Sequence, residues 1–108
     1  MLYIDEEQNI TLTRGDTAML VIALEDNNGE PYTPQEGDRL RFALGKNWGK
    51  DTLIIKDIPL DSCLLEIEPS DTKELPFKTY KYDVELTDAD GHVSTVLLGE
   101  FTVDKEVC

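Results

Sequence analysis

Residues 71–86 read DTKELPFKTYKYDVEL, and their pattern changes from that of a helix to that of a strand with no loop between the two. The first part, residues 71–75, follows Pro69 and predicts one helical turn. A side-chain oxygen of Ser70 or Asp71 is expected to cap this turn, because the first backbone N–H groups of a helix have no partner within it.

The second part of this stretch alternates with a period of two, which is typical of a strand with one buried face. Tyr80, Tyr82, Val84 and Leu86 fall on one face, and polar residues fall on the other. A helical turn that leads directly into a Tyr-x-Tyr strand is typical of a β-sandwich where the chain crosses between sheets, and there a tyrosine hydroxyl bonds to nearby backbone. We therefore predict that Tyr80 or Tyr82 buries its ring and donates its hydroxyl to backbone near residues 71–76.

Short apolar runs separated by turn residues continue along the rest of the chain, and no segment shows sustained helical periodicity. We predict turns or loops at residues 14–16, 26–29, 45–50 and 88–91. Further strands are predicted at residues 10–12, 17–24, 40–44, 52–58, 63–68 and 93–103, with a bulge at Gly99. The sequence thus predicts a single all-β domain over residues 1–108. Its fold class is an immunoglobulin-like antiparallel β-sandwich of about seven strands with one short helical turn near residues 70–75.

Acidic residues dominate the composition. The chain has 23 Asp and Glu against 10 Lys and Arg among 108 residues, a formal net charge of −13. Such a charge repels nucleic-acid backbones and anionic lipid surfaces, so we expect neither nucleic acid nor a membrane as a partner. The amino-terminal residues lack the basic and apolar regions of a signal peptide, and Cys63 and Cys108 do not make a disulfide framework. We expect a protein that is not secreted by a signal peptide and that stays in a reducing cytoplasm.

Three segments carry a resemblance to a known family: ITLTRGDTAMLVIAL (residues 10–24), PYTPQEGDRLRFAL (31–44) and IEPSDTKELPFKTYKYDVELTDADGHVSTVLLGEFTV (67–103). They resemble small immunoglobulin-like proteins encoded by phages and prophages of Gram-positive bacteria, similar to the amino-terminal domain of phage baseplate upper proteins. The resemblance rests on turn and core positions and implies no catalytic residues. It implies a protein found in the virion or in the bacterial host cytoplasm.

The side chains that could carry chemistry are better explained by turns. His92 is the only histidine and lies in a turn, with no reason to approach Ser94 or Cys63 as a catalytic base. Asp88 and Asp90, with Glu85 nearby, offer oxygens to calcium, but the Asp-Gly step explains them as a hairpin turn. We therefore predict no catalytic residue, no cofactor and no bound metal ion, and we do not expect an enzyme.

Some apolar residues are not explained by a sandwich core. If Leu20 and its alternating neighbours face inward, Met19 and Val21 face outward, which is unusual for a solvated sheet. The same reasoning leaves Leu64 and either Val96 or Leu98 outside, and it places Trp48 in a polar loop. Scattered surface apolar residues are common, so this pattern has an ordinary explanation as well. We interpret these six residues as a candidate protein interface.

Two functions are compatible with these observations. The first is a structural or interaction protein of a phage, a tail or baseplate accessory that binds other virion proteins and that assembles in several copies if the same face pairs with itself. The alternative is an acidic phage protein that binds and blocks a host protein, either a defence protein or one that normally binds nucleic acid, because dense carboxylates can imitate phosphates.

Overall fold

The computed structural model describes residues 2–4, 6–26, 28–47 and 50–105. These residues form the strands β1 (Leu2–Ile4), β2 (Ile10–Thr13), β3 (Ala18–Val21), β4 (Arg39–Asn47), β5 (Lys50–Ile58), β6 (Leu64–Ile67), β7 (Thr79–Thr87) and β8 (Val93–Asp104). A short helix, α1 (Pro69–Thr72), lies between β6 and β7.

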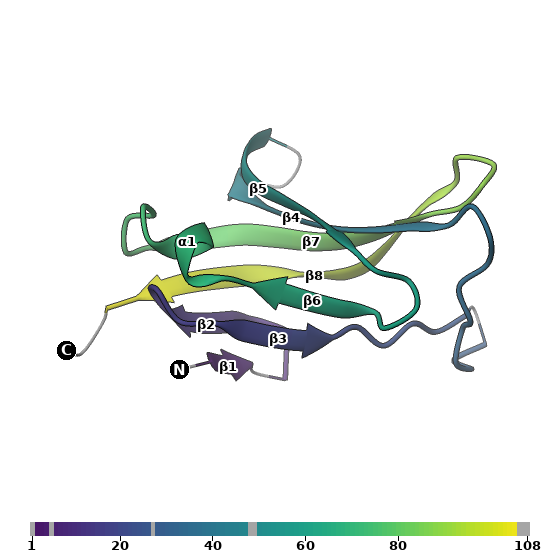
Figure 1. The fold of residues 1–108 in the computed structure, drawn as a ribbon, viewed down its shortest axis with the longest axis horizontal. Coiled ribbons are helices and arrows are strands. Elements are labelled where there is room, and N and C mark those ends of the chain that lie inside the picture. Colours follow the sequence, from purple (N-terminus) through teal and green to yellow (C-terminus); the bar gives the residue numbers. More distant parts are fainter. Residues whose placement is uncertain (1, 5, 27, 48–49, 106–108) are drawn as a thin grey trace.

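The strands form two sheets that pack against each other through one core. The large sheet has the order β1-β2-β8-β7-β4-β5, and the small sheet pairs β3 with β6. In Figure 1 the small sheet lies in front of the large one, and α1 lies at the opposite end of the sandwich from the hairpin that joins β7 to β8. The predicted all-β sandwich with one short helical turn is confirmed.

One pair of strands departs from the predicted antiparallel arrangement. β2 and β8 run parallel, with Ile10 opposite Phe101 and Leu12 opposite Val103. The other strand pairs among the described residues are antiparallel. β2 and β8 end at the same end of the sandwich, where the backbone N–H of Arg14 donates to the carbonyl oxygen of Asp104. The turn at residues 14–16 then carries the chain from β2 to the small sheet.

The core follows the alternation that the sequence displays. Its buried apolar residues are Ile10, Leu12, Ala18, Ile22, Leu24, Leu40, Phe42, Leu44, Ile58, Leu65, Ile67, Tyr80, Tyr82, Val84, Phe101 and Val103. At its centre the rings of Phe42, Tyr82 and Phe101 contact one another, with centroids 5.8, 6.3 and 6.4 Å apart. Aromatic contacts of this kind each add about 0.5–1.5 kcal/mol beyond the burial of their area.

The helical turn exists but begins earlier than predicted. α1 starts at Pro69, its N-cap is Glu68, and the backbone N–H of Glu68 donates to the Asp71 carboxylate at 2.7 Å. The prediction that Ser70 or Asp71 is the cap residue is wrong, because Pro69 has a backbone angle suited to the first helical position and no N–H that needs a partner. Asp71 instead supports the cap from within the first turn.

The predicted tyrosine corner is confirmed. The Tyr80 ring is buried, and its hydroxyl donates to the carbonyl oxygen of Pro76 at 2.8 Å. Tyr82 is also buried, and its hydroxyl donates to the carbonyl oxygen of Gln8, a residue far away in sequence. Both tyrosines therefore fix backbone outside the strand that carries them.

Two bonds tie α1 to other parts of the sandwich. The backbone N–H of Gly15, in the turn after β2, donates to the Thr72 hydroxyl at 2.9 Å. The Lys56 ammonium on β5 lies 2.6 Å from a carboxylate oxygen of Asp71. α1 therefore connects the large sheet to the turn that leads into the small one.

Several strand boundaries differ from the prediction. β1 was not predicted, because three residues are too few to show a period. The predicted strand at residues 17–24 is shorter, since regular pairing in β3 covers only Ala18–Val21. Residues 45–50 were predicted to form a loop, but Gly45 pairs with Thr52 and Asn47 with Lys50, so the hairpin of β4 and β5 continues to residues 47 and 50. Pairing with a neighbouring strand overrides the loop-like composition there.

The predicted bulge at Gly99 is wrong. The register between β7 and β8 shifts between Val84 and Glu85, and Val96 is the additional residue on β8. Gly99 serves a close approach instead, because a Cβ atom there would lie 2.7 Å from the Gln8 carbonyl oxygen and 3.0 Å from the Tyr82 ring.

Candidate functional site

The outer face of the small sheet is apolar, as the sequence predicts. The antiparallel register places Val21 opposite Leu64 and Met19 opposite Glu66, so these four side chains share one face. Met19 is 58% exposed and Val21 is 74% exposed, while Leu64 is half-buried. We call Met19, Val21 and Leu64 the outer apolar face.

The other candidate interface residues lie elsewhere. Leu98 is 48% exposed on the outer face of the large sheet, whereas Val96 packs partly against the core. Leu98 is therefore the exposed one of these two, and Trp48 lies outside the described residues. The candidates do not gather on one surface, because alternation distinguishes inward from outward residues but does not say to which sheet an outward residue belongs.

Asp83 lies beside Leu98 in an unusual setting for a carboxylate. Cross-strand pairing places it between Leu98 on β8 and Ala43 on β4. Its Oδ1 atom is buried and has no hydrogen-bond partner among the described residues. Burial raises the pKa of Asp83 above its ordinary value, repulsion by Glu85 raises it further, and Arg41 opposes the shift.

A cleft opens between the two sheets at the end that carries the β7–β8 hairpin. It has a volume of about 800 Å³ and is open to solvent. Its apolar lining comes from both sheets and includes Val21, Leu24, Val96 and Leu97. Carboxylates and other polar groups also line it: Glu25, Asp26, Tyr32, Asp88, His92 and Ser94.

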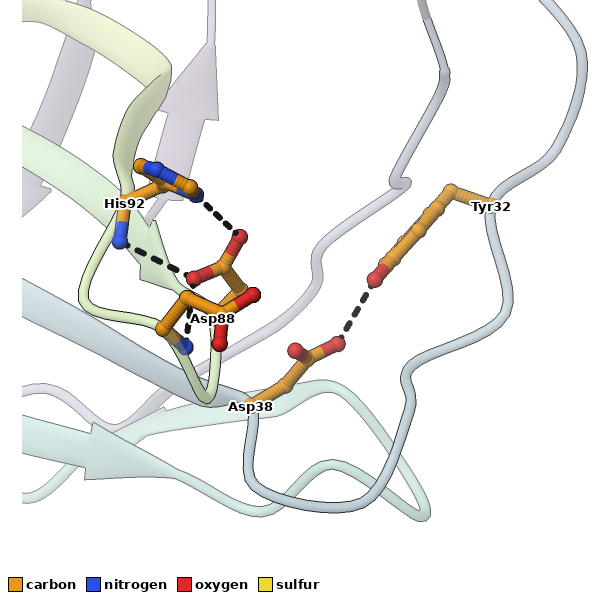
Figure 2. A network of polar contacts seen from close by, with 5 residues as sticks. Tyr32, Asp38, Asp88 and His92 are labelled. Carbon is orange, nitrogen blue, oxygen red and sulfur yellow. Dashed lines mark hydrogen bonds and ion pairs between the residues drawn. The ribbon is translucent and has the colours of Figure 1, made fainter.

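A hydrogen bond stabilises the loop at one end of this cleft. The Tyr32 hydroxyl donates to the Asp38 carboxylate at 2.7 Å, and the same carboxylate oxygen accepts the backbone N–H of Gln35 at 2.8 Å. Figure 2 shows Tyr32 reaching from its loop to Asp38, beside the hairpin turn with Asp88 and His92. The bond to Asp38 raises the pKa of Tyr32, and desolvation and the negative charges of Asp38 and Asp88 raise it further.

Asp88 organises the hairpin turn. Its carboxylate accepts the backbone N–H groups of Asp90 and His92, each at 2.9 Å, and it lies 3.1 Å from the His92 Nδ1 atom (Figure 2). These bonds, led by the one from the His92 backbone, lower the pKa of Asp88. A Cβ atom on Gly37 would lie 2.6 Å from the Cβ of Ala89, so the hairpin turn also packs directly on the loop that precedes β4.

The same turn contains the group of side chains whose spacing suits a metal ion. Ligand atoms of Asp88, Asp90 and His92 lie within 4.8 Å of one another. Asp88 Oδ1 already accepts two backbone hydrogen bonds within the turn, and Asp88 Oδ2 lies 3.1 Å from the His92 Nδ1 atom. The turn therefore explains why these residues are close together, and the prediction that the protein needs no metal stays a prediction.

One edge of β8 borders the cleft. On the side away from β7, β2 pairs with β8 only from Phe101 to Asp104. Among the described residues, no strand pairs with residues 93–98 of β8 on that side. We call residues 93–98 the open edge. Alternation did not reveal this edge, because it depends on where β2 begins to pair and not on the sequence of β8.

None of the described residues form a helix with the length and hydropathy needed to cross a membrane. Comparison of the chain with protein-family models, curated proteins and solved structures yields no match. The resemblance to phage immunoglobulin-like proteins therefore stays a prediction.

Proposed function

We propose that this protein acts by binding other proteins, as a phage- or prophage-encoded tail or baseplate accessory without enzymatic activity. The observation that carries the proposal is the outer apolar face, where Met19 and Val21 are more than half exposed beside Leu64 on the small sheet. Apolar groups framed by charged residues are typical of protein interfaces. Glu66 lies in this face, and Glu25 follows β3 closely in sequence.

The contrast with β7 supports the same proposal. The outward residues of β7 include Lys81, Asp83 and Glu85, and Lys81 is paired with Glu100 at 2.9 Å. The outward side of β7 thus has the polar character that is typical of a solvated sheet, whereas the outer apolar face lacks it. A partner that covers Met19 and Val21 explains the difference.

The acidic character of the cleft favours a second candidate function. Glu25, Asp26 and Asp88 line it, and the chain as a whole carries a net charge of −13. A host protein with a basic surface for nucleic acid is a suitable target for such a surface. In this case the protein blocks its target instead of building a particle.

The experiment uses tagged protein expressed in cells in which the phage or prophage is induced, with captured proteins quantified by mass spectrometry. The test variant is Met19→Glu, which places a charge in the outer apolar face. The matched control is Ile55→Glu on β5, because Ile55 is equally exposed, at 58%, but lies on the other sheet. We expect Met19→Glu to lose tail or baseplate proteins and Ile55→Glu to retain them.

Two other outcomes contradict the proposal. If both variants capture the same proteins as the wild type, the outer apolar face is not the interface. If the main captured protein is a host defence or nucleic-acid-binding protein, the second function holds in place of the first. Thermal unfolding of all three proteins checks that each variant is folded.

A further inference from the structure

The open edge of β8 presents backbone groups beside which no strand lies in the described part of the chain. The backbone N–H of Glu100 points away from β7, because it donates to the Asn9 side chain at 2.9 Å. Successive residues of a strand alternate in direction, so the N–H of Leu98 also points to this side. The edge therefore offers hydrogen-bond donors and acceptors in the spacing of a strand.

Nothing in the sequence of this edge blocks the addition of a strand. Proteins commonly protect such edges with Lys or Pro, and residues 93–98 read VSTVLL. Val93 is 58% exposed and Leu98 is 48% exposed, so the side chains of the edge are accessible as well. β2 already shows that β8 accepts a neighbour on this side, and a strand added at the open edge would continue the line of β2.

The cleft next to the open edge provides a place for the side chains of an added strand. Val96 and Leu97 from the open edge line one wall, and Val21 and Ala23 line the other. Every second side chain of an added strand would enter this cleft, since side chains of a strand alternate between its faces. Apolar side chains at these alternate positions of the added strand would fill the cleft between the two sheets.

Charge indicates what kind of strand is accommodated. Glu25, Asp26 and Asp88 line the cleft, and none of its described lining residues is Lys or Arg. A second copy of this chain brings another net charge of −13, and its own residues 93–98 carry no basic group. The net charge of −13 therefore favours, by long-range attraction, an extended segment of another protein that alternates apolar with basic residues. Its apolar side chains would enter the cleft and its basic side chains would lie on the opposite face of the added strand.

We propose that the open edge of β8 binds such a basic, apolar-alternating segment of a partner protein by strand addition, with its apolar side chains in the cleft. This inference rests on the proposed function as a protein-binding module, and it names a surface that shares Val21 with the outer apolar face but does not include Met19 or Leu64. Main-chain hydrogen bonds supply affinity in this mode, and the side-chain pockets supply selectivity.

The test uses synthetic peptides and the intact protein. The probe is a short peptide that alternates lysine with valine. One comparison peptide has the same composition with lysines and valines in two blocks, and another has glutamate in place of lysine. We expect the alternating lysine peptide to bind at least about tenfold more tightly than either comparison peptide. Its affinity should fall as salt rises, because the charges are opposite.

A change in the edge itself separates strand addition from simple charge attraction. Leu98→Pro removes one N–H of the open edge, and Leu98→Ala is the matched control that keeps it. We expect Leu98→Pro to weaken binding of the alternating peptide by about tenfold or more and Leu98→Ala to change it little. Amide exchange of residues 94–98 should slow on peptide binding to the wild type.

A second probe keeps the test decisive if Leu98→Pro does not fold. N-methylation of alternate peptide nitrogens removes donors from the peptide without altering the protein. Binding should be abolished only when the methylated nitrogens are those that face β8, because alternate N–H groups of a strand point to opposite sides. Equal binding of the methylated, block and alternating peptides overturns strand addition and leaves an adventitious attraction of charges. Self-association of the wild type with protection of residues 94–98 also overturns the proposal, in favour of a second copy as the occupant.

Failure of this inference is distinguishable from failure of the proposed function. Met19 does not line the cleft, so Met19→Glu tests the outer apolar face alone. Partner capture that depends on Met19 but is unaffected by Leu98→Pro rejects strand addition and retains the proposed function. Partner capture that is lost in Leu98→Pro but retained in Met19→Glu rejects the outer apolar face as the interface and retains strand addition.

Discussion

Replacement of Tyr80 by Phe removes one hydrogen bond from an otherwise unchanged core. Tyr80 is 1% exposed, and its hydroxyl donates to the Pro76 carbonyl oxygen at 2.8 Å. A bond of this kind contributes about 1 kcal/mol net to the free energy of unfolding. With an unfolding entropy of about 2.1 cal/mol/K per residue, a chain of 108 residues should lose roughly 4 °C in Tm.

Thermal and urea unfolding of Tyr80→Phe and the wild type at neutral pH measure this difference. Tyr32→Phe provides a comparison, because the Tyr32 hydroxyl bonds to the buried Asp38 carboxylate and its loss should cost more, about 1.5–3 kcal/mol. A loss of less than about 0.5 kcal/mol in Tyr80→Phe would refute the reasoning, since that is the lower end of the range for such a bond.

The pH dependence gives an independent check. Burial raises the pKa of Tyr80 above 10.0, so the fold favours the neutral phenol. This contribution is fully present below pH 10.0 and is lost as the pH rises through the pKa of the folded state. Phe has no such proton, so the difference in stability between the two proteins should narrow in strongly alkaline solution. A constant difference across this range would contradict the assignment.

Three further predictions concern other sites. Gly99→Ala should lower the free energy of unfolding, measured by urea titration, by about 1–3 kcal/mol, because the added Cβ would lie 2.7 Å from the Gln8 carbonyl oxygen. Unchanged stability would mean that the backbone around Gln8 moves away without cost. Asp83→Asn should raise stability at neutral pH by about 1 kcal/mol. This gain should fade as the pH falls through the raised pKa of Asp83 toward 3.8, and a gain that persists in acid would reject burial of the charge as its cause. Millimolar calcium should not raise Tm relative to the same concentration of magnesium, since hydrogen bonds within the turn account for the position of the Asp88 carboxylate. A rise with calcium alone would establish a calcium site.

Local patterns predicted the parts of the fold that depend on local chemistry. The alternation from Tyr80 to Leu86 is reproduced in the structure, and so is the turn at residues 14–16, where the Asp16 N–H donates to the Thr13 carbonyl oxygen. The inward and outward residues of β3 are also as predicted. These features depend on residues close in sequence, and their period or turn chemistry is visible there.

Pairing between distant segments was not predictable in this way. The parallel pairing of β2 with β8, the short β1 and the extension of β4 to Asn47 depend on which strand lies alongside. For the same reason, Met19 and Leu98 appeared equivalent as outward residues although they lie on different sheets. The cleft and the open edge also result from the arrangement of strands, and no motif marks them.

The bonds of α1 have a consequence for the order in which the chain folds. The bond between Gly15 and Thr72 joins residues 57 positions apart, whereas the β7–β8 hairpin closes over a short turn. Long loops lose more chain entropy on closing, so such contacts tend to form after the local ones. We expect the α1 end of the sandwich to close after the hairpins, with Thr72→Val accelerating unfolding while refolding stays nearly unchanged in stopped-flow measurements. A four-residue helix would then govern how long the folded protein persists and have little influence on how fast it forms.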